Sequence, residues 1–228
     1  INSPLLELLG ALFMVLGAIN FALHFSVIRR KSLLHFWHDP ESRLYIIFLL
    51  CATILTCFTL IYYQHFEHMG TAFIKSLFQV TTFSTTTGFF SASYREWPTY
   101  LPFFLVFVSL IGGCAGSTAG GIKIIRLLVL KKQASREIKR LIHPNSHYVI
   151  KLGLSRLHHK TLDAILGFFT IFVIFFVVML LILLAMGLDF VSAFSALSSA
   201  ISNTGIGLGV VTENFKTLSD PIKIVLSF

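Results

Sequence analysis

The sequence predicts an all-α integral membrane protein built from units of helix, re-entrant loop and helix. Three observations lead to this prediction. Hydrophobic residues make up 55% of the 228 residues and charged residues only 12%, whereas a soluble domain carries about 25% charged residues. Uncharged stretches long enough to cross a bilayer recur along the chain. The basic residues gather between these stretches, as they do in membrane proteins.

Four uncharged stretches reach the length of about 20 residues that a membrane-spanning helix needs. They lie at residues 8–28, 44–63, 98–122 and 164–188. A fifth stretch begins near Pro221 and runs to Phe228. The chain starts and stops in apolar sequence and shows no signal peptide, so we expect it to be a piece of a longer protein.

The basic residues predict which side of the membrane each connection faces. Fourteen of the 18 lysines and arginines lie in residues 29–43 and 123–160. The positive-inside rule places both segments in the cytoplasm. The net charge of +8 therefore reflects topology. A nucleic-acid partner would need a basic face on a folded domain, so we exclude nucleic acid and expect the lipid bilayer as the surrounding partner.

Two further apolar segments, residues 71–88 and 190–205, cannot cross the membrane without reversing this charge sidedness. Each must enter the membrane and return to the same side. Irregular backbone at membrane depth persists only where it is buried in protein or lines a water-filled path. The sequence therefore predicts two re-entrant pore loops.

The two loops form an internal repeat. A shift of 117 positions places Gly88 on Gly205 and Thr87 on Thr204, and each segment lies between two spans. Internal repeats are common in transport proteins. We divide the chain into residues 1–30, the closing helix of a preceding unit; 31–142, one whole unit; 143–160, a cytoplasmic linker; and 161–228, a further unit that stops within its last helix.

The loops carry the residue types that a dehydrated monovalent cation requires. Backbone carbonyls replace the water of such an ion when the chain is extended and turned inward. Glycine accepts positive φ, and the C-terminal end of the short helix before each loop favours a cation. The alternative is a pair of polar surface turns, which the matched repeat makes less favoured. The candidate filter residues are Thr85, Thr86, Thr87, Gly88, Ser202, Asn203, Thr204 and Gly205.

Residues 112–121 contain five glycines, and each costs about 1 kcal/mol in a helix relative to alanine. We interpret this stretch as a break in the third span that blocks or opens the path beneath the loops. The alternative is close helix packing through glycines four residues apart. The candidate gate residues are Gly112, Gly113, Gly116, Ser117, Thr118, Gly120, Gly121 and Lys123.

Lys123 has two interpretations. Its side chain either reaches the cytoplasmic surface in the ordinary way, or points toward the pore and interacts with the ion or the gate.

A phosphate-binding loop is excluded, although Gly116 and Gly121 have its spacing, because Ile122 stands where the lysine is needed.

Three motifs together resemble the Trk/Ktr/HKT superfamily of potassium transporters, and most closely its bacterial membrane subunits of the TrkH and TrkG type. They are Thr85-Thr86-Thr87-Gly88-Phe89, the glycine-rich stretch 112–123, and Asn203-Thr204-Gly205-Ile206-Gly207-Leu208-Gly209. The glycine-rich stretch is the most specific of the three. Ile206 departs from the pattern, since a proline is expected there.

The resemblance implies four repeats around a pseudo-fourfold pore, with Gly88 and Gly205 as the filter glycines of the third and fourth repeats. It implies potassium uptake, with potassium bound only at the filter residues and no organic cofactor. The glycine-rich stretch becomes an intramembrane gating loop. The resemblance also implies a homodimer, a cytoplasmic nucleotide-binding ring of the TrkA type as partner, and a multi-pass location in the bacterial inner membrane.

Three rival functions remain at the level of sequence. A sodium-conducting or poorly selective transporter would have the same fold. A non-conducting membrane scaffold would share the spans. An intramembrane enzyme is disfavoured, because the only acidic residues that we place near membrane depth are Glu7 and Asp189, both close to span ends.

Overall fold

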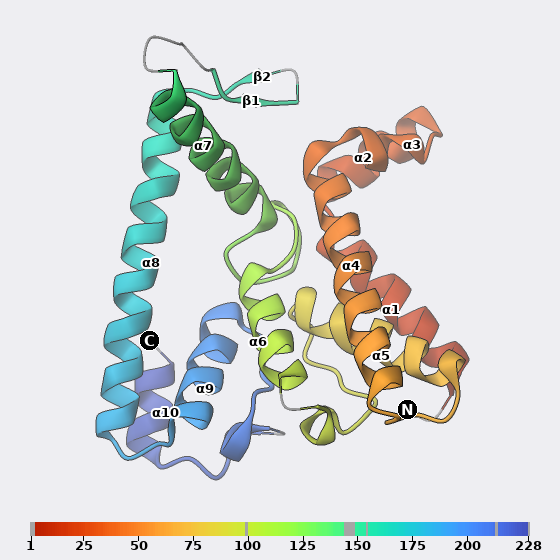
Figure 1. Ribbon diagram of the computed structural model, residues 1–228, viewed down its shortest axis with the longest axis vertical. Coiled ribbons are helices and arrows are strands. Elements are labelled where there is room, and N and C mark those ends of the chain that lie inside the picture. Colours follow the sequence, from red (N-terminus) through yellow and green to blue (C-terminus); the bar gives the residue numbers. More distant parts are fainter. Residues whose placement is uncertain (1–2, 99, 144–148, 154, 213, 228) are drawn as a thin grey trace.

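The computed structural model describes residues 3–98, 100–143, 149–153, 155–212 and 214–227 (Figure 1). The described chain forms helices α1 (Pro4–Ala18), α2 (Phe21–Arg30), α3 (Leu34–His38), α4 (Pro40–Tyr62), α5 (Met69–Ser84), α6 (Leu101–Ile111), α7 (Ile124–Ile142), α8 (His159–Ala185), α9 (Phe190–Ser202) and α10 (Asp220–Leu226), with two short 3-10 turns at Tyr94–Glu96 and Gly209–Val211. The predicted helical membrane fold is confirmed.

One short hairpin departs from the all-α prediction. Strands β1 (Lys151–Leu152) and β2 (Ser155–Arg156) pair antiparallel within the predicted linker 143–160. Gly153, at a φ of +60°, follows β1 directly and accepts the left-handed backbone. Residues 144–148 and 154 of that linker lie outside the described residues, as do positions 1, 2 and 228 of the predicted end segments.

Two predicted spans are continuous helices. α4 covers the predicted span 44–63, and α8 covers most of the predicted span 164–188, beginning five residues earlier and ending at Ala185. Both are long and apolar enough to cross a membrane. In Figure 1 they stand on opposite sides of the molecule, with α6 and α9 between them. Few residues of α8 are fully buried in the described chain, and most are exposed or half-buried.

The prediction of one straight span over residues 8–28 is wrong. α1 and α2 meet at a bend of 100°. Ile19 is extended, and the side chain of Asn20 accepts a hydrogen bond from the N–H of Ala22 at 2.8 Å, which starts a new helix in a new direction. α2 ends with Arg29 and Arg30 and lies with α3 and the hairpin at one end of the molecule (Figure 1). This is the end to which the sequence assigns the cytoplasmic side.

The third predicted span, 98–122, is broken at its glycines. α6 ends at Ile111, and Gly112 follows with a φ of +70°. α7 starts only at Ile124, so the segment between the two helices is not helical. A helix packed through its glycines, which was the alternative interpretation, is therefore excluded.

The two segments predicted to be re-entrant each contain a short helix. α5 has 16 residues and α9 has 13. In Figure 1 both lie in the half of the molecule opposite the hairpin, and their C-terminal ends point toward the middle of the molecule. Each is followed by a stretch without regular secondary structure.

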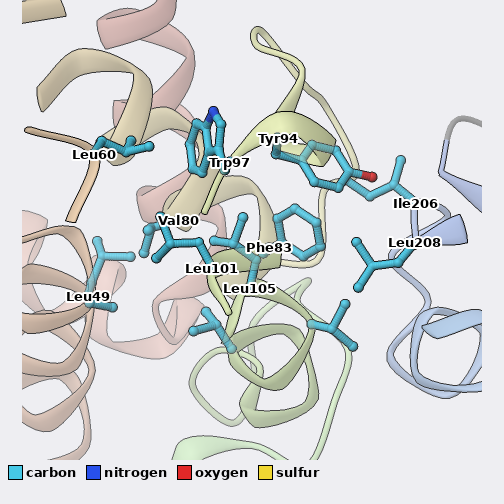
Figure 2. Packing of buried hydrophobic residues seen from close by; sticks show 13 residues of the cluster. Leu49, Leu60, Val80, Phe83, Tyr94, Trp97, Leu101, Leu105, Ile206 and Leu208 are labelled. Atoms are coloured by element: carbon cyan, nitrogen blue, oxygen red, sulfur yellow. The ribbon is translucent and has the colours of Figure 1, made fainter. Parts of the chain in front are cut away.

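One apolar cluster joins the two re-entrant units (Figure 2). Phe83 of α5 contacts Tyr94 edge-on, with ring centroids 5.4 Å apart. Ile206 and Leu208, which follow the second loop, belong to the same cluster. Its other buried members come from α4, α5, α6 and the chain between α5 and α6: Leu49, Ala52, Leu60, Val80, Trp97, Leu101, Leu105, Val106 and Val108. The loops are therefore held against each other by packing.

Candidate functional site

The first candidate loop begins where α5 ends at Ser84. Thr86 has a φ of +54° and Gly88 a φ of +83°, so two residues of this short loop have a left-handed φ. The N–H of Thr87 donates to the carbonyl of Thr82 at 3.0 Å and closes the end of the helix. The hydroxyls of Thr85 and Thr87 lie 2.7 Å apart and share a hydrogen bond.

The second candidate loop has the same construction. Asn203 has a φ of +57° and Gly205 a φ of +84°. The N–H of Thr204 donates to the carbonyl of Ser199 at 2.9 Å. The hydroxyls of Ser202 and Thr204 share a hydrogen bond at 2.8 Å. Every one of these features lies 117 positions after its counterpart in the first loop, so the repeat that the sequence suggests extends to individual hydrogen bonds.

The two loops touch through their backbones. A side chain at Gly88 would overlap with the carbonyl oxygen of Thr204, so only glycine allows the chains to approach this closely. Ser202 and Thr204 are buried, whereas Thr87, Asn203 and Gly205 are exposed in the described chain. Glycine backbone and small hydroxyl groups thus lie together at the ends of two helices whose C-terminal dipoles favour a cation.

The position of α9 depends on an aspartate at its start. Asp189 caps the helix, and its Oδ2 accepts the N–H of Ser192 at 3.0 Å. Hydrogen bonds from the Ser192 side chain and backbone lower the pKa of this carboxyl below its ordinary value. The ionised carboxylate also suits the positive end of the helix dipole.

The glycine-rich segment, residues 112–123, lies directly against both loops. The N–H of Gly120 donates to the hydroxyl of Thr86 at 2.7 Å. A side chain at Gly120 would overlap with the carbonyl oxygen of Ser202. Gly120 therefore contacts the first loop through a hydrogen bond, and its Cα, which carries no side chain, contacts the second loop.

The segment folds back on itself and on the end of α6. The N–H groups of Ile122 and Lys123 donate to the carbonyls of Leu110 and Ile111, at 2.9 and 3.0 Å. Gly112, Gly116, Gly121 and Lys123 all have φ values between +68° and +76°. Gly113 packs against Ala18 and Ala119 so closely that a side chain there would overlap with both.

The bend between α1 and α2 and the glycine-rich segment satisfy each other's hydrogen bonds. The carbonyls of Gly17 and Ala18 accept the N–H groups of Thr118 and Cys114, at 3.2 and 2.9 Å. The hydroxyl of Thr118 also donates to Gly17, at 3.0 Å. In return, Phe21 donates to the carbonyl of Gly116 at 3.1 Å. Buried backbone groups need such partners, and here each irregular segment supplies them to the other.

The remaining predicted gate residues make contacts inside the segment. Ser117 donates its hydroxyl to the carbonyl of Cys114 at 2.6 Å. The ammonium group of Lys123 donates to the carbonyl of Ala119. This contact lies within the glycine-rich segment itself, and an orientation of Lys123 toward the pore stays a prediction.

Sequence reasoning missed two acidic contacts. Glu41 in the first turn of α4 accepts the N–H of Ala115 at 2.6 Å while only 5% exposed. Its spacing of four residues from buried Tyr45 was the available signal for an inward face. Glu7 was noted only as lying near a span end, yet it forms an ion pair with Lys75 at 2.6 Å. Lys75 also donates to the carbonyl of Ser91 at 3.1 Å.

Among the described residues, no group of three or more histidine, cysteine, aspartate or glutamate side chains is arranged to hold a metal ion. The oxygen atoms gathered at the site are instead carbonyls, hydroxyls and one amide. Such neutral oxygens suit a monovalent cation that sheds its water.

Comparison with known proteins agrees with a cation as the ligand. The family model TrkH, described as cation transport protein, matches residues 1–228. The Trk system potassium uptake protein TrkH of Vibrio parahaemolyticus is 42% identical over 228 residues, covering 99% of this chain and 47% of that protein. TrkH of Salmonella typhimurium is 40% identical over 225 residues, with the same two coverages. TrkG of Escherichia coli is 34% identical, covering 99% of this chain and 46% of that protein.

A solved structure has the same fold. The crystal structure of the potassium transporter TrkH from Vibrio parahaemolyticus superimposes with a TM-score of 0.93 at 40% identity, covering 99% of this chain and 49% of that one. The chain spans about half the length of the curated relatives it matches.

Proposed function

Because the chain belongs to the TrkH family of cation transport proteins, we propose that the full-length protein takes up potassium ions through a filter that includes the two re-entrant loops. One observation carries the proposal. The two loops have the same helix caps and the same pair of left-handed residues, and they meet at Gly88 and Thr204. Two matched loops at one point are the geometry that a shared ion path requires.

In this proposal the candidate filter residues replace the hydration shell of the ion. Backbone carbonyls of residues 85–88 and 202–205 act as ligands, and no bond is made or broken. Left-handed Thr86 and Asn203 turn the chain out of each helix, and Gly88 and Gly205 follow with the positive φ that glycine accepts. The relatives named as potassium uptake proteins support potassium as the ion.

The glycine-rich segment acts as the gate in this proposal. It is the only described segment that hydrogen-bonds Thr86 and also contacts the carbonyl of Ser202. In this position it blocks the way between the two loops and the end of the molecule that carries α2 and α3. It has no helical hydrogen bonds of its own to hold it rigid, which suits a part that moves.

The four-part division of the chain belongs to the same proposal. Residues 1–30 close a second repeat, residues 31–142 form the third, and residues 161–228 belong to the fourth, with a cytoplasmic linker at 143–160. The relatives are named as proteins of a Trk system, and we propose a cytoplasmic nucleotide-binding ring of the TrkA type as the partner. We also propose a homodimer in the bacterial cytoplasmic membrane, with no enzymatic step.

Rubidium uptake into liposomes tests the function. The full-length protein, reconstituted with its cytoplasmic partner, is expected to accumulate rubidium above empty vesicles, and excess potassium is expected to compete more strongly than sodium. Equal competition by sodium would favour a poorly selective transporter. No uptake above empty vesicles would favour a non-conducting scaffold.

A further inference from the structure

Glu41 is a buried carboxylate that the filter and gate assignments leave without a role. It lies in the first turn of α4, just after Asp39, which caps that helix by accepting the N–H of Ser42 at 2.7 Å. Glu41 is 5% exposed, and its Oε1 accepts the backbone N–H of Ala115 at 2.6 Å. A short, charge-assisted hydrogen bond therefore joins α4 to the glycine-rich segment.

Two side chains of opposite charge contact the two ends of residues 115–119 in the glycine-rich segment. Glu41 holds Ala115, and the ammonium group of Lys123 holds the carbonyl of Ala119, four residues further on. The two side chains are close enough to interact electrostatically. Gly120, which touches both loops, comes directly after Ala119. The part of the segment between the two charged contacts thus ends at the loops.

The contact made by Glu41 differs in kind from the other anchors of the segment. The hydrogen bonds to Gly17 and Ala18 join neutral backbone groups. A buried carboxylate, in contrast, loses much more when its donor leaves, because an ionised group without a partner is far more costly to bury than a neutral one. Any movement of Ala115 away from α4 therefore takes this donor from the Glu41 carboxylate and raises the free energy of the protein.

We propose that Glu41 is a positioning residue that holds the glycine-rich segment against the two loops and so favours the closed gate. This inference rests on the proposed function of the segment as a gate. It identifies α4 as the helix that anchors the gate and the Glu41 carboxylate as the anchoring group.

The test uses the full-length protein in liposomes without its cytoplasmic partner. Glu41→Ala removes the acceptor and is expected to raise rubidium uptake per reconstituted molecule about tenfold, the size expected for a hydrogen bond to a charged group. Glu41→Gln keeps an oxygen that accepts from Ala115 without the charge, and a smaller rise is expected. Asp163→Asn, which neutralises an exposed carboxylate in the second turn of α8, is the matched control and leaves uptake unchanged.

A second measurement follows the segment directly. Cys114 is buried next to Ala115. In protein whose other cysteines are replaced by alanine, a water-soluble maleimide is expected to label Cys114 faster in Glu41→Gln than in the wild type. Because glutamine fills the same volume, faster labelling reports movement of the segment and not a hole left by the substitution.

The outcomes separate the two proposals. Wild-type uptake and labelling rates in both Glu41 variants would overturn the positioning role, as would lower uptake with unchanged labelling, which marks a purely structural group. If the wild type gives no uptake even with its partner, while labelling of Cys114 still depends on Glu41, the proposed function fails and the positioning role stands.

Discussion

Gly88 and Gly205 occupy equivalent positions in the two loops, but their surroundings differ. Both have a positive φ, +83° and +84°. A side chain at Gly88 would overlap with the carbonyl oxygen of Thr204, whereas nothing lies within 4 Å of the place where a side chain at Gly205 would be. Within the described chain, the first glycine is required by backbone conformation and by space, whereas the proposed four-repeat arrangement would place a further repeat beside the second.

The close approach at Gly88 predicts a large effect of alanine there. The left-handed conformation alone costs about 1–2 kcal/mol for an L-residue. Gly88→Ala should destabilise the full-length protein by more than this, because the loops must also separate. Thermal unfolding in detergent measures the loss, with Gly167→Ala as control, since that helical glycine of α8 has open space around it. A loss of no more than about 1–2 kcal/mol at position 88 would contradict the assigned contact between the loops.

Sequence reasoning found the loop glycines but not Glu41. The glycines are visible because their offset of 117 residues repeats in both loops. Glu41 is hidden because an acidic residue after Asp39-Pro40, beside a basic segment, is typical of a solvated helix start. Its burial depends on the glycine-rich segment, 74 positions away, and no local pattern reports a contact over that distance.

At the scale of elements, two irregular segments depend on each other. The bend between α1 and α2 offers the carbonyls of Gly17 and Ala18, and the segment between α6 and α7 takes them. The break between α6 and α7 was predictable from five glycines in ten residues. The bend was not, because residues 8–28 are uncharged throughout, and Asn20, which starts α2, was a single polar residue within a length that suits one span.

Shortening the glycine-rich segment tests its role as a gate. Deleting residues 116–118 removes the hydrogen bonds to Phe21 and Gly17 and pulls Gly120 away from the loops. Rubidium uptake in the absence of the cytoplasmic partner is expected to rise several-fold in liposomes. Unchanged or lower uptake, in protein with a normal gel-filtration profile and thermal midpoint, would show that the segment serves packing instead.

The ion pair between Glu7 and Lys75 fastens α1 to the first re-entrant helix. Their side chains are 2% and 18% exposed, and Lys75 also holds the carbonyl of Ser91 beyond the loop. Glu7→Ala leaves a largely buried ammonium group without its carboxylate, which should cost about 3 kcal/mol, the low end of the range for broken buried pairs because Lys75 is partly exposed.

A double-mutant cycle checks that the pair acts as a unit. The loss in the thermal stability of Glu7→Gln is expected to be partly recovered when Lys75→Gln is added, because neither charge is then left alone. Additive losses in the double variant would show that the two side chains act independently.

At the scale of the whole molecule, one apolar cluster joins the two short helices α5 and α9 and the loops that follow them. Phe83 and Tyr94 on the side of the first loop and Ile206 and Leu208 after the second lie in this cluster (Figure 2). The two continuous spans α4 and α8 were predictable from hydropathy, whereas the other two predicted spans are interrupted, and the sidedness stays a prediction. The packing of the cluster was not predictable, since apolar side chains that face lipid and those that face another helix are of the same residue types in a membrane.

The chain covers about half of its relatives, so the ion path as a whole belongs to the proposal for the full-length protein. Within this half, we propose that ions pass beside the point where Gly88 meets the second loop, and that the closeness of that contact sets which ion passes. A change there should alter selectivity, whereas a change on the lipid-facing helix α8 should not.

The ratio of potassium to sodium flux in the Gly88→Ser variant tests this claim most directly. The full-length protein is reconstituted in liposomes, and Gly167→Ala is measured beside it. We expect the ratio to fall several-fold in Gly88→Ser, because the new side chain displaces the carbonyl of Thr204, and to stay at the wild-type value in Gly167→Ala. A wild-type ratio in a folded Gly88→Ser protein would contradict the assignment of the loops as the filter.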